Sequence, residues 1–250
     1  MTLTYIFHSS FALETQEAIL VFDYWLDPAR TADRLLRSDK PLYVFASHFH
    51  EDHFSRHILD WQKQKKDITY ILSKDILKHH RAERQEADVW LAKGGSWQDK
   101  LVEVHATGSN DSGVSWIVKT EGRTIFHAGD LNNWYARFLN EENAGELIHS
   151  METTEDIDPV KEEKRFLGEL KDIKKLSSGF DLAMFPVDGR IGNGYTRGAR
   201  QFIKQFRIGI FVPMHFVVSG FESAWRMKEF TDAMNIPFWC ISKEGEQIRL

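Results

Sequence analysis

The sequence predicts an α/β protein, because short apolar strands alternate with helical patterns along the chain. The strand-like runs lie near residues 42–47, 68–72, 88–91, 182–187, 208–213 and 237–241, and the helical patterns lie around residues 29–37, 55–65, 75–86, 197–206 and 222–234. The 250 residues are 42% hydrophobic and include 18 Phe and 8 Trp, enough for a sizeable core. We therefore expect one large domain over residues 1–250.

Two stretches predict β-hairpins. Residues 11–22 and 114–126 each hold two strands of alternating apolar residues about a polar turn. An ungapped superposition of the two stretches places Phe11 on Ser115 and Phe22 on Phe126, with only slight identity. This pattern suggests two similar halves that begin near residues 1 and 105.

The segment at about 138–178 is strongly charged and predicts a helical insertion into the domain. It includes the runs Glu162-Glu-Lys-Arg165 and Lys171-Asp-Ile-Lys-Lys175. Two interpretations stay open for it: a lid over a functional site, or a solvated helical face with no part in function.

The overall composition limits the classes of partner and the cellular compartment that we expect. A net charge of −5 with no long basic run disfavours nucleic acid as a partner and favours a small molecule. The single cysteine, Cys240, has no partner for an internal disulfide, and its apolar run 236–241 predicts a core residue in a strand. No apolar segment approaches the ~20 residues that span a bilayer, and the N-terminus lacks a basic leader. We expect a cytoplasmic protein without membrane contact.

The most informative motif is the loop His48-Phe-His-Glu-Asp-His53, between an apolar strand at 42–46 and a helical pattern after Ser55. Residues two apart in an extended segment project to the same side, so His48 and His50 can bind one cation. Asp52 and His53 then point elsewhere and can bind a second. Imidazole and carboxylate ligands suit zinc, manganese or iron. The alternative is a histidine-rich surface loop explained by composition alone.

Two later strands each end in one further ligand-type residue. Thr124-Ile-Phe-His-Ala-Gly-Asp130 ends in a glycine turn and a carboxylate, and Ile208-Gly-Ile-Phe-Val-Pro-Met-His215 ends in a histidine. Taken singly, Asp130 is explained as a turn residue and His215 as a packed strand-end histidine. Beside the histidine-rich loop, both are candidate metal ligands.

These motifs, H-x-H-x-D-H, a G-D after an apolar strand and a late P-x-H, resemble those of the metallo-β-lactamase superfamily across nearly the whole chain. The resemblance implies a four-layer αββα sandwich with two divalent metal ions, zinc or manganese/iron, at one edge of the sheets. It implies that His48 and His50 hold the first ion, that Asp52, His53 and His215 hold the second, and that Asp130 bridges them. The chain looks most similar to the branch that contains the ascorbate-phosphate lactonase.

One position departs from the family pattern. Many members have a third histidine for the first ion in a segment resembling H-x-P-G-H-T, whereas this chain has Ser109 at the matching position. Asp111, two residues on, is the best replacement because a carboxylate ligates divalent cations better than a neutral serine does. The alternative is that residues 108–113 form only a tight turn into the second hairpin.

Five residues are candidates for substrate contact. Trp134 follows the bridging carboxylate, and the glycine-rich loop 188–197 carries Asp188, Arg190 and Tyr195, so backbone N–H groups and arginines there can bind an anion. The loop can equally be a connection whose arginines form surface ion pairs. The resemblance places His8 near the metals, although a core histidine remains the simpler interpretation.

The predicted activity is hydrolysis of an ester, lactone or phosphodiester bond in a small, anionic metabolite. Two cations would activate a shared water for attack, and Asp52 would orient it and carry its proton to the leaving group. Three alternatives remain: a metal-binding sensor or scaffold, favoured by the missing third histidine; a nuclease, disfavoured by the acidic charge; and a diiron redox protein, disfavoured because such members usually carry glutamate in place of His50. A homo-oligomer is compatible with the sequence.

Overall fold

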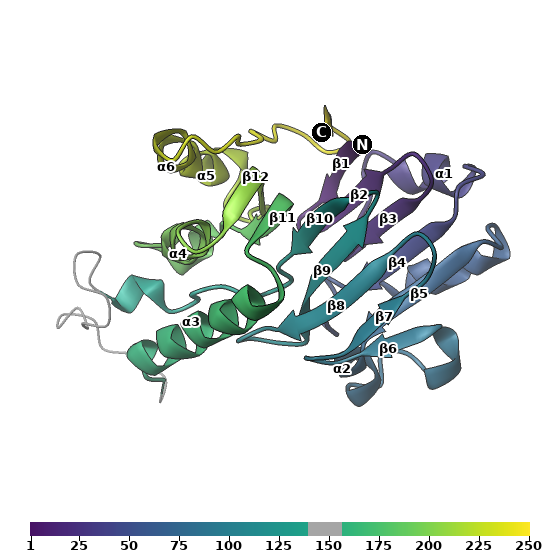
Figure 1. The fold of residues 1–250 in the computed structure, drawn as a ribbon, viewed down its shortest axis with the longest axis horizontal. Helices are drawn as coiled ribbons and strands as arrows, with labels where there is room; N and C mark the ends of the chain where they lie inside the picture. Colours follow the sequence, from purple (N-terminus) through teal and green to yellow (C-terminus); the bar gives the residue numbers. More distant parts are fainter. Residues whose placement is uncertain (140–156) are drawn as a thin grey trace.

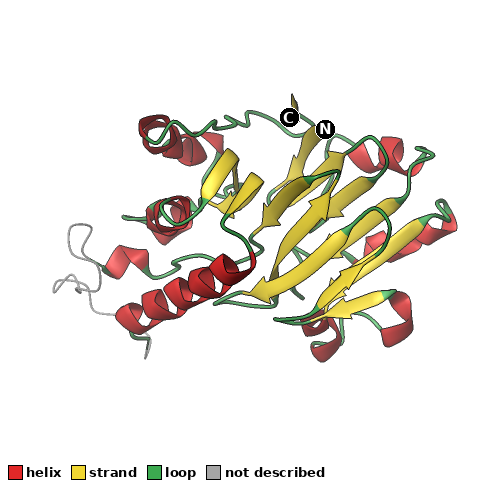
Figure 2. Cartoon of the chain, viewed as in Figure 1, coloured by secondary structure: helices red, strands yellow, loops and turns green. Residues whose placement is uncertain are grey.

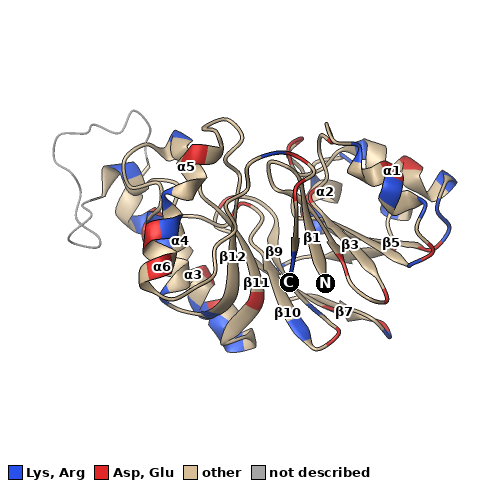
Figure 3. Cartoon of the chain, turned by 90° about the horizontal axis from the view of Figure 1, so that it is seen from above, with Lys and Arg blue, Asp and Glu red and all other residues tan. Residues whose placement is uncertain are grey.

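The computed structural model describes residues 1–139 and 157–250 and has four layers (Figure 1). Two β-sheets pack face to face, and one set of helices covers the outer face of each sheet. Figure 3, viewed from above, shows α1 and α2 on one side of the sheets and α3 to α6 on the other. The predicted αββα sandwich is therefore confirmed.

The first sheet comes from the N-terminal half of the chain and one C-terminal strand. Its strand order is β13-β1-β2-β3-β4-β5-β6. Along this order, neighbouring strands from β13 as far as β3 are antiparallel, and neighbouring strands from β3 as far as β6 are parallel. The strands are β1 (Thr2–Phe7), β2 (Ser10–Glu14), β3 (Ile19–Phe22), β4 (Leu42–Ala46), β5 (Ile68–Ser73), β6 (Val89–Leu91) and β13 (Gln247–Arg249).

The second sheet repeats this scheme. Its order is β12-β11-β10-β9-β8-β7, with antiparallel pairs from β7 to β10 and parallel pairs from β10 to β12. Both predicted hairpins are present, as β2–β3 and β9–β10, and the shared strand order supports the suggested repeat of two halves. The strands are β7 (Ser96–Gln98), β8 (Glu103–Gly108), β9 (Val114–Thr120), β10 (Arg123–His127), β11 (Gly179–Pro186) and β12 (Arg207–Met214).

The helices are short apart from α3, as Figure 2 shows in red. Helices α1, α2 and a 3₁₀ helix pack on the first sheet, and the remaining α-helices pack on the second. The α-helices are α1 (Thr31–Leu36), α2 (Lys74–Lys78), α3 (Pro159–Leu176), α4 (Arg197–Ile203), α5 (Phe221–Trp225) and α6 (Met227–Ala233), and the 3₁₀ helices are η1 (Arg56–Lys63), η2 (Arg84–Glu86), η3 (Ala136–Phe138) and η4 (Gly189–Ile191).

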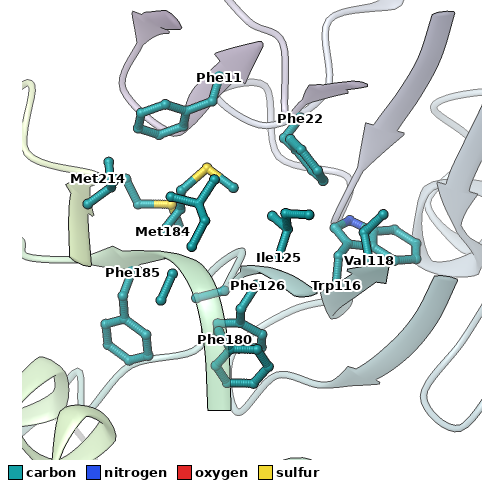
Figure 4. Packing of buried hydrophobic residues seen from close by; sticks show 14 of the residues in the cluster. Phe11, Phe22, Trp116, Val118, Ile125, Phe126, Phe180, Met184, Phe185 and Met214 are labelled. Carbon is teal, nitrogen blue, oxygen red and sulfur yellow. The ribbon is translucent and has the colours of Figure 1, made fainter. Parts of the chain in front are cut away.

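The central strands are apolar on both faces, because one face packs on the other sheet and the opposite face packs on helices. In β4, Tyr43 and Phe45 belong to the core between the sheets, whereas Leu42 and Val44 pack with the helices outside the first sheet. Figure 4 shows the centre of the core, where Phe11 and Phe22 of the first sheet face residues of the second, among them Trp116, Val118 and Ile125. Phe126 lies on the other face of the second sheet and stacks on Phe202 of α4.

The predicted strand at 237–241 is wrong. The segment forms only an isolated bridge between Phe211 and Phe238, and Ile241 donates its N–H to the carbonyl of Trp239 two residues back, which bends the chain out of extended form. Pro237 has no N–H to donate to a ladder. Cys240 is correspondingly half-buried, not a core residue.

Three predicted helices differ in detail. Residues 56–63 form a 3₁₀ helix, the pattern at 75–86 divides into α2 and η2, and the pattern at 222–234 divides into α5 and α6. Four strands, β1, β7, β8 and β13, lie outside both the strand ranges and the hairpins that the sequence predicts.

Helix α3 occupies the second part of the predicted charged insertion, and residues 140–156 of that insertion lie outside the described residues. Phe166, Leu170 and Ile173 of α3 are fully buried in the core cluster. The helix is thus a part of the outer layer. Among the described residues, we find no helix that is long and apolar enough to cross a membrane.

Candidate metal centre

Side chains that ligate metals gather at one edge of the sandwich, where strands of both sheets end. His48, His50, Asp52 and His53 lie in the loop that follows β4. Asp130 follows β10 and His215 follows β12 in the other sheet. Parallel strands that end at one edge bring their following loops together, which is why residues distant in sequence meet here.

Asp130 reaches the site through a glycine turn. Gly129 has a φ of +52°, and a Cβ added to it would lie 2.8 Å from the carbonyl oxygen of Val114 and 2.9 Å from the Cβ of Ser47. Only glycine fits this close approach between β9 and the loop after β4 without displacing them. The turn therefore fixes the Asp130 carboxylate beside the histidines.

A first group of ligand atoms consists of His48, His50 and Asp130. One atom from each lies within 4.8 Å of the others. The Nε2 atom of His48 is 2.9 Å from Nδ1 of His50 and 3.3 Å from Oδ2 of Asp130. His48 is fully buried and His50 is half-buried, so this group opens towards solvent through His50.

A second group consists of Asp52, His53, His215 and also His8, again with one atom from each within 4.8 Å. The Oδ2 atom of Asp52 is 3.9 Å from Nε2 of both His53 and His215. The other carboxylate oxygen of Asp130, Oδ1, is 3.0 Å from Nε2 of His53 and 3.3 Å from Nε2 of His215. Asp130 thus presents one oxygen to each group.

The buried atoms of the second group fit a cation. Nε2 of His8, His53 and His215 and Oδ1 of Asp130 are inaccessible to solvent and have no hydrogen-bond partner among the described residues. Buried polar atoms without partners are costly, and four that converge on one point are explained by a positive ion between them. The imidazole and carboxylate donors suit zinc, manganese or iron.

The electrostatics of Asp130 agree with this arrangement. Burial raises the pKa of the Asp130 carboxyl, but the imidazoles of His53, His215 and His48 outweigh burial and hold this pKa well below its usual range. The carboxylate is therefore ionised and can ligate on both sides.

Asp23, at the end of β3, orients His53. Its Oδ2 atom accepts a hydrogen bond from Nδ1 of His53 at 2.7 Å, and its carboxylate also accepts bonds from the N–H and hydroxyl of Ser47. Burial raises the pKa of Asp23, but His127 and His53 outweigh it and lower the pKa below its usual value. In the sequence, the one signal of this role is a carboxylate directly after an apolar strand.

Asp188 orients His215 in the same way. Its Oδ2 atom lies 2.9 Å from Nδ1 of His215 and 2.6 Å from an Nη2 of Arg190. Burial opposes ionisation, yet His215 and Arg190 lower the pKa of Asp188 to about 2. The structure thus places Asp188 behind a candidate metal ligand, where the sequence had suggested substrate contact.

Asp111 lies near the first group but outside it. Its side chain is exposed and lines the same pocket as His50 and Asp130. Desolvation at the pocket and the negative charge of Asp130 raise the pKa of the Asp111 carboxyl. The group of converging ligand atoms contains His48, His50 and Asp130 without it, so its predicted role as a replacement ligand stays a prediction.

A pocket of about 640 Å³ lies over the two groups. Of the residues predicted to contact substrate, Trp134 and Arg190 line it. Tyr195 lines a separate hollow, where its hydroxyl donates to the carbonyl of Ser223. The first turns of α3 contribute lining residues that the sequence did not single out, namely Asp158, Lys161, Glu162 and Arg165.

The other histidines lie apart from the two groups. Nε2 of His127 lies 2.9 Å from the carbonyl of Ser9, and its ring stacks on Phe22 behind the site. His105 pairs with Glu103 on the surface, and His57, His79 and His80 are exposed. His149 lies outside the described residues.

The fold and the two ligand groups define a class of protein, an αββα sandwich with a metal centre at the edge of its sheets. Residues 2–142 match the family model described as the Beta-lactamase superfamily domain. The match covers more than half of the chain, and the protein belongs to this superfamily.

Relatives and solved structures agree with this assignment. The chain is 26% identical over 237 residues to a metal-dependent hydrolase of Desulforamulus reducens, which covers 86% of this chain and 84% of the relative. A metallo hydrolase of Ignicoccus hospitalis has a similar structure, with a TM-score of 0.64 at 17% identity, covering 99% and 97% of the two chains. Both the Desulforamulus relative and the Ignicoccus protein are named as hydrolases, which is the class of enzyme that the sequence predicts.

A structure from another chemical class shares the fold. The diiron β-hydroxylase of Streptomyces venezuelae has a TM-score of 0.63 at 10% identity, over 100% of this chain and 54% of that one. At such low identity the similarity concerns the fold alone.

Proposed function

We propose that this protein is a metal-dependent hydrolase that cleaves an ester, lactone or phosphodiester bond in a small, anionic metabolite. The observation that carries the proposal is the sharing of Asp130 between two groups of ligand atoms at the floor of an open pocket. The activity named for the relative supports the reaction class.

Two divalent cations, zinc or manganese/iron, would be held by these residues. His48, His50 and one oxygen of Asp130 would hold the first, and Asp52, His53, His215 and the other oxygen of Asp130 would hold the second. When bound, such cations supply Lewis acidity and lower the pKa of water, which permits hydrolysis at neutral pH.

Asp52 is placed to handle the proton. Its side chain is 31% exposed, and it lines the pocket while the other members of its group are buried. Its Oδ2 atom makes the contacts with the group, at 3.3 Å from Nε2 of His8 and 3.9 Å from Nε2 of His53 and of His215. Oδ1 takes no part in these contacts. A carboxylate in this position can orient the attacking water and transfer its proton to the leaving oxygen.

Cationic side chains at the rim of the pocket favour an anionic substrate. Lys161, in the first turn of α3, is exposed, and its ammonium forms no ion pair with another described residue. Arg190 is 47% exposed and is held by Asp188, which fixes its guanidinium beside the pocket. Trp134 supplies an apolar wall, with its ring 5.3 Å from that of His215. A carboxylate or phosphate group next to the scissile bond would be bound between Lys161 and Arg190.

The test is a screen of metal-free protein reconstituted separately with zinc, manganese and iron. The substrates are aryl esters, lactones and aryl phosphodiesters, each with and without an extra anionic group. Asp130→Asn should abolish turnover, whereas Asp172→Asn, on the exposed face of α3, should retain it. Metal binding without turnover of any class, or turnover that survives Asp130→Asn, would refute the proposal.

One observation favours a second candidate, a metal-binding sensor or scaffold. The first ligand group has only three members among the described residues, with serine where the family pattern has a histidine. A protein that binds one cation and hydrolyses none of the substrates in the screen would support this candidate.

A further inference from the structure

We infer that His8 is a fourth protein ligand of the cation held by Asp52, His53 and His215, and that this second site fills before the first. The inference rests on the metal binding assumed in the proposed function, but it does not require hydrolysis. It concerns a residue outside the six ligands that the sequence motifs supply, and it assigns an order of affinity to the two sites.

The burial of His8 is the first observation. The residue is 2% exposed, and neither ring nitrogen forms a hydrogen bond of normal geometry with a described residue. Its Nε2 atom lies 3.3 Å from Oδ2 of Asp52, and its ring centroid lies 4.0 Å from that of His215. A core histidine normally satisfies at least one ring nitrogen, as His127 does with the carbonyl of Ser9. His8 instead directs a nitrogen into the second group.

The backbone holds His8 in this position at a cost. His8 has a φ of 53° and His215 a φ of 64°, in the left-handed region that side chains other than glycine rarely adopt. The two strained residues are joined, because the N–H of His215 donates to the carbonyl of His8 at 3.1 Å. The N–H of His8 donates to the hydroxyl of the buried Tyr5 at 2.8 Å. Strain of this kind persists where the surroundings fix a functional geometry.

The two sites differ in how many ligands they offer. The second offers three imidazoles, the Asp52 carboxylate and Oδ1 of Asp130, whereas the first offers His48, His50 and Oδ2 of Asp130. More donors that are already converged bind a cation more tightly, because less ordering is required when it enters.

The sites differ also in the support of their ligands. In the second site, the distal nitrogens of His53 and His215 bond to the buried carboxylates of Asp23 and Asp188. In the first site, the hydroxyl of Ser47, at 3.0 Å, is the one hydrogen-bond partner of Nδ1 of His48 within residues 1–139 and 157–250. Carboxylate partners fix the imidazole tautomer and raise its basicity, which strengthens ligation. Both differences predict that the second site fills first.

The competing explanation is that His8 only donates a hydrogen bond to Asp52 and so positions that carboxylate. The variant His8→Gln separates the two roles, because a glutamine amide can donate to Asp52 but is a poor ligand for these cations. His105→Gln, at a half-buried histidine that pairs with Glu103 away from the two groups, is the matched control.

The experiment titrates metal-free protein with cobalt(II), followed by its visible absorption, and with zinc in competition with a chelator. The parent should bind the first equivalent about tenfold or more tightly than the second. His8→Gln should weaken the first equivalent at least about tenfold, change the cobalt spectrum of that equivalent and leave the second unchanged. His105→Gln should match the parent. An unchanged first equivalent and spectrum in His8→Gln would overturn the inference, as would a parent that binds no metal.

A measurement on the parent keeps the inference testable if His8→Gln does not fold. X-ray absorption of protein loaded with one equivalent of zinc should show three imidazole ligands, which correspond to His8, His53 and His215. Two imidazoles would contradict the inference. If three are found and the substrate screen shows no turnover, the proposed function fails while the assignment of His8 stands.

Discussion

The carboxylates behind the ligands govern how firmly the metal centre is held. Asp188 lies 2.9 Å from the distal nitrogen of His215 and also pairs with Arg190, so it orients the imidazole without reaching the cation itself. The affinity of a cation for the site depends on this orientation, because a free imidazole ring samples other rotamers and tautomers.

We predict that Asp188→Asn weakens binding of a divalent cation about 10–100-fold while the protein stays folded. The amide keeps the shape of the carboxylate but loses the charge that holds His215 in one tautomer. Competition with a chromogenic chelator measures the change. Asp172→Asn, at a carboxylate of α3 that pairs with Lys93 and Lys175, should leave the affinity unchanged; an equal loss in both variants would contradict a specific role for Asp188.

At the level of single residues, the sequence predicts the ligands better than their supports. His48, His50, Asp52 and His53 stand in a dense motif whose spacing restricts their geometry. Asp23 stands alone after a strand, and its role depends on a contact 30 residues away with His53. His8 is equally isolated in sequence, and its carbonyl accepts a hydrogen bond from the N–H of His215, which follows a strand of the other sheet. Local patterns carry no information about contacts that only the folded chain creates.

Helix α3 depends on its first turn, which also lines the pocket. Asp158 caps the helix: its Oδ1 atom accepts hydrogen bonds from the N–H groups of Val160 and Lys161, and Pro159 occupies the first helical position. This arrangement satisfies two of the N–H groups that have no partner within a helix.

We therefore expect Asp158→Ala to lower the free energy of unfolding by about 1 kcal/mol. Asp158→Asn is the matched control, because asparagine caps helices about as well as aspartate, and it should cost only a few tenths of a kcal/mol. Urea unfolding followed by circular dichroism distinguishes the two. Equal stability of the alanine and asparagine variants would show that the cap contributes little here.

Tyr70 connects β5 to the 3₁₀ helix at 56–63 through a hydrogen bond of its hydroxyl group. Its buried phenol should make the free energy of unfolding decrease at alkaline pH. Its hydroxyl donates to the carbonyl of Ile58 at 2.7 Å, and burial raises the pKa of the phenol above its usual value of 10.0. Because the folded pKa is the higher one, the unfolded chain releases this proton first as the pH rises. The stabilisation is complete below pH 10.0 and decreases above it.

The free energy of unfolding should thus decrease above this pH, by up to about 1.4 kcal/mol per pH unit for each phenol affected. Tyr24, whose pKa burial also raises, should contribute to the same decrease. Tyr70→Phe should cost about 1 kcal/mol at pH 8, through the lost hydrogen bond, and should make the alkaline decrease shallower. Urea unfolding between pH 8 and pH 11 tests both statements, and a slope as steep as the parent's in Tyr70→Phe would disprove the assignment to Tyr70.

Hydrophobic periodicity predicts the type and the order of most helices and strands. It fails where backbone hydrogen bonding determines whether an apolar run joins a sheet. The parallel strands β4, β5, β11 and β12 contain apolar runs that are buried between the other sheet and one layer of helices, so their pattern is clear. The run at 237–241 is just as apolar, but Pro237 and a bend at Trp239 prevent a ladder. The strands β7 and β13 are three residues long and largely exposed, which leaves little pattern to detect.

Over the whole molecule, stability depends on the two buried clusters rather than on apolar residues as such. Leu182 in β11 is 1% exposed within the cluster between the sheets, and Leu26 is 47% exposed on the surface. The same substitution by alanine should cost about 2–5 kcal/mol at Leu182 and less than about 0.5 kcal/mol at Leu26. Urea unfolding at a fixed metal concentration measures both, and similar costs would contradict the burial of Leu182.

The metal centre joins the two sheets, so cations should stabilise the fold as a whole. His8, His48 and His53 follow strands of the first sheet, and Asp130 and His215 follow strands of the second. Without a cation, four buried polar atoms at this junction form no hydrogen bond of normal geometry with a described residue, which is costly. A cation that binds only the folded state adds about 2.7 kcal/mol to the free energy of unfolding at a concentration 100-fold above its dissociation constant.

Chelation should therefore lower the melting temperature, and zinc or manganese should restore it in a concentration-dependent way. Asp130→Ala loses the residue shared by both groups and should melt at nearly the same temperature with and without metal. If chelation leaves the melting temperature of the parent unchanged, the ligands do not act as a bridge between the sheets.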